Sequence, residues 1–111
     1  MAGMSPRVAI VTGAGRGIGA ATVRALAADG FAVLAVDAGG DIDALPYSLA
    51  TAAELEGVVA ATDAGDRVVA HLADVRDHAA LAAAVAEAES RWGGLDVAIG
   101  CAGVIGGGVN Q

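Results

Sequence analysis

A glycine-rich segment near the start of the chain constrains the fold more than any other feature. It reads Thr12-Gly13-Ala14-Gly15-Arg16-Gly17-Ile18-Gly19 and lies between an apolar run and an alanine-rich stretch. Glycine can make the tight turn from a strand into a helix and lets the backbone approach a ligand closely. The amides that open the helix lack partners and carry partial positive charge, which suits an anion. The segment therefore predicts a phosphate-binding strand–turn–helix unit; the alternative is a glycine-rich turn without a ligand.

Each part of this segment has an expected role. Gly13 permits the turn out of the strand, Gly17 brings the backbone close to the phosphates, and Gly19 lets the helix pack against the sheet. The segment lacks the lysine that a P-loop requires. Ile18 is expected to cover the bound ligand. The candidate binding residues of the segment are Gly13, Gly15, Arg16, Gly17, Ile18 and Gly19.

Four short apolar runs predict a parallel sheet. They are Val8–Val11, Ala32–Val36, Val68–Leu72 and Val97–Ile99. Each run is nearly continuous rather than alternating, which is typical of strands that helices bury on both faces. Helical patterns separate the runs, so the order is βαβαβαβ and the fold class is α/β. A doubly wound Rossmann-type sheet then has the strand order 3-2-1-4, with four of its usual six strands in this chain.

Helix signals occupy the segments between the apolar runs. The first helix is expected over 17–29, with Gly30 after its end. Thr51 and Glu54 have the spacing of a capping box that opens the second helix, which Gly65 closes. Asp77 is expected to cap the third helix before Gly93-Gly94, and its buried stripe is Leu81, Val85, Ala88 and Trp92. The 111 residues are enough for one domain, with an additional segment at 38–50 and a tail at 106–111.

Asp37 ends the second apolar run, 24 positions after Gly13. A dinucleotide fold places an acidic residue near this point, where it binds the adenosine ribose hydroxyls. A carboxylate there would repel a 2′-phosphate, which favours NAD over NADP as the cofactor. Arg16 weakens this preference, because a basic residue in the loop could reach a 2′-phosphate. The alternative for Asp37 is an ordinary acidic residue at the end of a strand.

The spacing Thr-Gly-x-x-x-Gly-Ile-Gly resembles the fingerprint of the short-chain dehydrogenase/reductase family, and the resemblance covers residues 7 to about 108. It implies that Asp74 holds the adenine ring and that Val75 lines the pocket; a turn or capping role is the alternative for Asp74. Where the family usually has Asn-Asn-Ala-Gly, this chain has Gly100-Cys101-Ala102-Gly103. Cys101, Ala102 and Gly103 are therefore expected to pack under the ribose through their backbone, without the usual asparagine contacts. A small buried loop residue is the simpler interpretation of Cys101.

One subgroup resembles the chain most. The run Leu45-Pro46-Tyr47-Ser48-Leu49-Ala50-Thr51, the segment 73–77 and the segment 102–105 are similar to mycofactocin-dependent members. That resemblance implies a segment over the nucleotide, tightly bound NAD, and electrons passed to the redox peptide mycofactocin. It also implies alcohol and carbonyl substrates and a parent protein that forms homo-oligomers. A plain surface loop is the alternative for residues 38–50.

The residues that would carry the family's chemistry are absent. The family uses a Tyr-x-x-x-Lys pair with a serine, and this chain contains no lysine. No catalytic residue is therefore assigned, and this chain alone is expected to be inactive. The first hypothesis is that it is part of a complete dehydrogenase. The alternatives are a non-catalytic NAD-binding module or pseudoenzyme, and a different Rossmann protein such as a methyltransferase, which the loop spacing disfavours.

An incomplete sheet has a further consequence. Helices over the first and fourth strands are expected to be missing, so a large apolar face would be open to water. The chain alone is then expected to be marginally stable, to aggregate or to need a partner fragment.

Composition excludes several other classes. The net charge is −7, and six scattered arginines without lysine argue against nucleic-acid binding. One cysteine and two histidines do not make a structural zinc site, so no metal is expected. No apolar run is long enough to span a membrane, and residues 1–7 lack the core of a signal peptide. The cytoplasm is the expected compartment.

Overall fold

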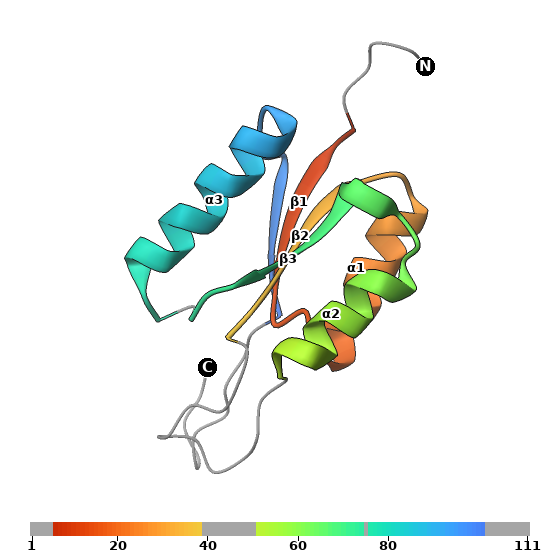
Figure 1. Ribbon diagram of the computed structural model, residues 1–111. Helices are drawn as coiled ribbons and strands as arrows, with labels where there is room; N and C mark the ends of the chain where they lie inside the picture. Colours follow the sequence, from red (N-terminus) through yellow and green to blue (C-terminus); the bar gives the residue numbers. More distant parts are fainter. Residues whose placement is uncertain (1–5, 39–50, 75, 102–111) are drawn as a thin grey trace.

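The computed structural model describes residues 6–38, 51–74 and 76–101. Their strands are β1 (Val8–Thr12), β2 (Ala32–Asp37), β3 (Val68–Leu72) and β4 (Val97–Gly100). The α-helices are α1 (Gly17–Ala28), α2 (Ala52–Ala61) and α3 (His78–Trp92), and a short 3₁₀ helix spans Gly65–Arg67. The strands form one parallel sheet in the order β3-β2-β1-β4, which confirms the α/β class and the predicted order. Figure 1 shows α1 and α2 on one face of this sheet and α3 on the other.

The strand register brings the carboxyl ends of the strands to one edge of the sheet. Thr12, the last residue of β1, pairs with Val36 of β2 and with Gly100 of β4. Asp37, the last residue of β2, pairs with Leu72 of β3. The turns that follow all four strands therefore begin at the same edge, where doubly wound folds bind their ligands. This edge is the lower one in Figure 1.

Two apolar cores, one on each face, explain why the strands read as continuous apolar runs. Ala9 and Val11 of β1 belong to the core under α1 and α2, while Val8 and Ile10 belong to the core under α3. Successive side chains of a strand point to opposite faces, so a strand buried on both faces is apolar at every position. In β2, all residues from Ala32 to Val36 are completely buried.

The expectation that the first strand lacks a covering helix is wrong. Val8 and Ile10 are 2% and 5% exposed, because Ala84 and Ala88 of α3 pack in the same core. Alanines let α3 approach the sheet closely enough to cover β1 as well as β2. The outer strand β4 alternates instead between half-buried residues and exposed ones, namely Ala98 and Gly100. In the described segments, the exposed large apolar side chains are those of Ile18 and Leu72, so no broad face of bulky groups lies open.

The helix ends follow the predicted signals with small differences. Gly30 adopts φ +91° two residues after α1 ends at Ala28, and Gly93 adopts φ +83° directly after α3. The second helix ends at Ala61, before Gly65, because the chain turns at Thr62 and Asp63 and Gly65 then opens the 3₁₀ helix. The predicted stripe of α3 missed Ala84, which is 1% exposed.

Candidate functional site

The turn after β1 has a backbone that requires glycine. Gly13 and Gly17 adopt φ +69° and +57°, in the left-handed region that favours glycine. The amide of Ala14 donates to the carbonyl of Val36 at 3.0 Å, so β2 holds the turn in place. A Cβ on Gly19 would lie 1.9 Å from the carbonyl oxygen of Gly13. Gly19 therefore packs against this turn, whereas the sequence analysis expected it to pack against the sheet.

Among the residues that the structure describes, no side chain caps the first turn of α1. Arg16 stands at the N-cap position without a side-chain cap, and the first turn contains no acidic residue. By contrast, Thr51 caps α2 and Asp77 caps α3. A Cβ on Gly17 would meet no atom of the described residues within 4 Å, so these residues leave space beside the backbone at this point. The free amides, the helix dipole and this space fit a bound phosphate group.

Asp37 is held against the glycine-rich turn. Its Oδ2 accepts a hydrogen bond from the amide of Gly15 at 2.9 Å, and its Oδ1 accepts one from the amide of Ala38 at 2.8 Å. A carboxylate has about four acceptor sites, so each oxygen retains a lone pair for a further donor. The carboxylate is thus oriented beside the turn and can still accept hydrogen bonds from sugar hydroxyls.

Arg16 forms a two-point ion pair with Glu54, although 38 positions separate them. Its Nε and Nη2 donate to the two carboxylate oxygens of Glu54 at 3.0 and 2.9 Å. Glu54 also accepts from the amide of Thr51 at 3.0 Å, while Thr51 Oγ1 accepts from the amide of Glu54, which completes the predicted capping box. These donors, Arg16 first, lower the pKa of Glu54 to about 2. The sequence pattern indicates only the capping role of Glu54, because no local pattern pairs residues so far apart.

Asp74 has the turn role that was the alternative in the sequence analysis. Its carboxylate accepts from the backbone amide of Arg76 at 2.9 Å and from the guanidinium of Arg76 at 2.8 Å. The guanidinium hydrogen bond, followed by the amide, lowers the pKa of Asp74. Asp74 follows β3 next to Asp37, whose carbonyl accepts from the amide of Ala73 at 2.9 Å. An adenine contact by Asp74 remains a prediction.

Cys101 lies at the end of β4 beside the turn after β1. Its amide donates to the carbonyl of Thr12 at 3.1 Å, and the half-buried side chain packs against the core under α1 and α2. Packing of this kind agrees with the interpretation of Cys101 as a small loop residue. Val75, Ala102 and Gly103, as well as residues 39–50 and 106–111, lie outside the described residues.

The predicted residues that can be located therefore gather at one edge of the sheet. The turn 13–19, Asp37, Asp74 and Cys101 lie at or just after the carboxyl ends of the four strands. Ile18, at 79% exposed, stands open at the start of α1. Within residues 6–38, 51–74 and 76–101, no group of three or more metal-binding side chains occurs. No helix in those ranges is long and apolar enough to cross a membrane.

A doubly wound parallel sheet, a glycine-rich turn after its first strand and an acidic residue ending its second define the Rossmann class of nucleotide-binding folds. Comparison with known proteins then assigns the family. Residues 7–111 match the short chain dehydrogenase family, and the chain belongs to it.

Individual relatives agree with this assignment. An uncharacterized oxidoreductase of Mycobacterium tuberculosis is 42% identical over 99 residues, which make up 88% of this chain and 36% of that protein. The (−)-trans-carveol dehydrogenase of Rhodococcus erythropolis is 37% identical over 105 residues, or 94% of this chain and 38% of that enzyme. The crystal structure of carveol dehydrogenase from Mycobacterium avium in complex with NAD superposes with a TM-score of 0.82 at 34% identity, covering 91% of this chain and 37% of the other. The chain thus spans less than two fifths of the length of these relatives.

Proposed function

We propose that this chain binds NAD and forms the nucleotide-binding part of a dehydrogenase that interconverts an alcohol and a carbonyl compound. The observation that carries the proposal is the uncapped start of α1 beside the oriented carboxylate of Asp37. In this arrangement, the amides of Gly17, Ile18 and Gly19 bind the pyrophosphate. Asp37 accepts hydrogen bonds from the adenosine ribose, and Ile18 covers the cofactor. Bound NAD supplies a hydride acceptor next to the substrate.

The relatives support both parts of the proposal. One similar structure is a carveol dehydrogenase in complex with NAD, and one relative is named as a dehydrogenase of trans-carveol, which is an alcohol. The proton transfer that accompanies hydride transfer needs an acid or base beside the substrate. The chain has no lysine for a Tyr-x-x-x-Lys pair, so we infer that these 111 residues bind the cofactor without turning over substrate.

The remaining parts of the proposal concern how the cofactor is used. We propose that the protein retains NAD and passes its electrons to mycofactocin; the similarity of the sequence at residues 38–50 to that subgroup supports this. NAD that remains with the purified protein through dialysis would agree with retention.

We also propose that the parent protein is a homo-oligomer in the cytoplasm that acts on a small molecule.

The test of the proposed function is calorimetric titration of the chain with NAD⁺. We expect saturable binding of one NAD⁺ per chain, weakened about 10- to 100-fold in Asp37→Ala because hydrogen bonds to a charged acceptor are lost. Asp29→Asn is the matched control, since Asp29 follows the other end of α1, away from the site. No binding, or equal loss in both variants, would refute the proposal.

A non-catalytic NAD-binding module is the second candidate, because the described site brings together groups suited to binding a nucleotide. Both candidates predict that the chain binds NAD⁺. They differ in the parent: a full-length protein that reduces NAD⁺ with carveol or another alcohol is a dehydrogenase, and one that only binds NAD⁺ is not.

A further inference from the structure

We propose that Glu54 is a positioning residue that makes the site prefer NAD to NADP, by holding the guanidinium of Arg16 in an ion pair. The inference rests on the proposed NAD site and deepens it. It assigns a role in cofactor choice to a residue of α2 that lies 38 positions from Arg16 in the sequence.

The geometry places Arg16 next to the residue expected to bind the ribose. Gly15 donates its amide to Asp37 at 2.9 Å, and the next residue along the chain is Arg16. Two neighbouring residues of the turn are thus each held by a carboxylate, Gly15 by Asp37 and Arg16 by Glu54. A ribose that contacts Asp37 lies close to the base of the Arg16 side chain.

Charge explains why the pairing matters for the choice of cofactor. A phosphate monoester carries roughly two negative charges at neutral pH, and NADP has one where NAD has a hydroxyl. An arginine near this position can accommodate that phosphate, because its planar fork matches both carboxylate and phosphate in a two-point geometry. In this protein, Glu54 already occupies the fork at two points, with N–O distances of 2.9 and 3.0 Å. A 2′-phosphate would therefore face the carboxylates of Asp37 and Glu54, together with an arginine whose positive charge Glu54 offsets. This arrangement disfavours NADP.

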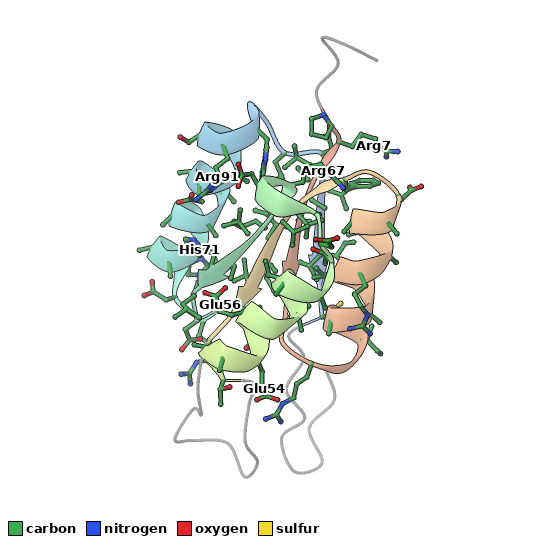
Figure 2. All side chains as sticks on the ribbon, turned by 45° about the vertical axis from the view of Figure 1, so that its right-hand side comes forward. Arg7, Glu54, Glu56, Arg67, His71 and Arg91 are labelled. Carbon is green, nitrogen blue, oxygen red and sulfur yellow. The ribbon has the colours of Figure 1, made fainter. Side chains whose placement is uncertain are left out.

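Glu54 is itself held in place for this role. Its Oε1 accepts both from Arg16 and from the amide of Thr51, at 2.9 and 3.0 Å. The backbone amide of Thr51, which any residue at this position supplies, thus helps to aim the carboxylate at the glycine-rich turn. In Figure 2, Glu54 lies at the first turn of α2, whereas Glu56 lies on a different side of the helix.

The capping box also makes a clean substitution possible. Glutamine can replace glutamate at the third helical position of a capping box, so Glu54→Gln preserves the cap and removes the charge. Glu56→Gln is the matched control, because it removes an equal charge from the same helix. Thr51→Ala is the complementary variant, since it removes the Thr51 hydroxyl from the cap and leaves the ion pair.

The experiment measures the dissociation constants of NAD⁺ and NADP⁺ for the 111-residue chain and these variants at low salt. In Glu54→Gln, we expect the ratio of the NADP⁺ constant to the NAD⁺ constant to fall about three- to tenfold, as one exposed charge near a phosphate would produce. The ratio should stay at the starting value in Glu56→Gln and in Thr51→Ala. Adding Arg16→Gln to Glu54→Gln should restore the ratio of the original chain. High salt should reduce the difference in this ratio between Glu54→Gln and the original chain.

The outcomes separate this inference from the proposed function. Binding of NAD⁺ with an unchanged ratio in Glu54→Gln would overturn the role of Glu54 and leave the NAD site intact. An equal fall of the ratio in Glu56→Gln would also overturn the role of Glu54, since the loss of any negative charge on α2 would then explain the effect. An equal fall in Thr51→Ala would do the same, since the loss of the helix cap would explain it. No binding of NAD⁺ by the original chain would overturn the proposed function, and the inference with it.

Discussion

Gly19 is the residue at which the turn after β1 leaves no room for a side chain. A Cβ there would lie 1.9 Å from the carbonyl oxygen of Gly13 and 2.6 Å from its carbon. Both atoms belong to the backbone, so a substitution must displace the turn itself. Because the same turn carries the amides proposed to bind pyrophosphate, stability and cofactor binding depend on this residue together.

Gly19→Ala should therefore lower the free energy of unfolding by about 1–3 kcal/mol, the usual range for overpacking, and should weaken NAD⁺ binding. Denaturant titration and calorimetry measure the two effects. Gly57→Ala is the matched control, because Gly57 lies inside α2 with nothing within 4 Å of an added Cβ. That variant should gain up to about 1 kcal/mol, since alanine is the better helix former. A Gly19→Ala protein as stable as the original would contradict the described turn.

At the scale of elements, the start of α2 and the glycine-rich turn of α1 are linked through one carboxylate. Glu54 closes the capping box of α2 and pairs with Arg16 at the start of α1. The pair is half-exposed, so its effect on stability should be small and should depend on salt. The link fixes how α2 begins relative to the loop and so shapes the site more than it stabilises the fold.

The pKa of Glu54 gives this link a defined pH dependence. In the folded chain the pKa is about 2, below the ordinary value of 4.5, so Glu54 favours folding while it is ionised. The contribution is fully present above about pH 4.5 and is lost as pH falls toward 2. The difference in melting temperature between the original chain and Glu54→Gln should therefore shrink from pH 6 to about pH 2.

Thermal melts followed by circular dichroism at several pH values test this. Comparing variants isolates Glu54 from the other twelve acidic residues of the chain, which has thirteen. Glu56→Gln is the matched control, because it removes an equal charge from the same helix. A constant difference between the original chain and Glu54→Gln across this range would mean that the ion pair does not form.

At the scale of the whole molecule, β4 is the least protected part of the described sheet. It forms an edge, and its outer face exposes Ala98 and Gly100. The inner strands β1 and β2, by contrast, are buried on both faces. An exposed edge with small side chains can pair with the edge of another copy.

The chain should therefore self-associate as its concentration rises, and sedimentation velocity over a range of concentrations measures this. Ala98→Lys should reduce the association, because a charge on an edge strand opposes pairing, while the exposed position tolerates the side chain. Ala25→Lys, on the exposed surface of α1, controls for the added charge. A cooperative monomer at every concentration would disprove this prediction and the expectation of marginal stability.

Much of this architecture follows from local patterns. The continuous apolar runs predicted buried parallel strands, because a strand covered on both faces must be apolar at every position. The capping box at Thr51 and the glycine after α3 also act over a few residues, and the structure bears both out. The glycine spacing resembles the fingerprint of the family, which the match over residues 7–111 confirms. The structure explains one of these glycines, because a Cβ on Gly19 would lie 1.9 Å from the carbonyl oxygen of Gly13.

The sequence by itself determined the element order, the strand order and the turn at the carboxyl edge, because periodicity, glycine placement and right-handed crossovers are local or general constraints. Only the tertiary structure decided that alanines of α3 cover β1, that Gly19 packs on the turn and that Arg16 pairs with Glu54. These contacts join residues of different elements, and their distances depend on how closely the helices approach the sheet and each other. No pattern within a single segment contains that information.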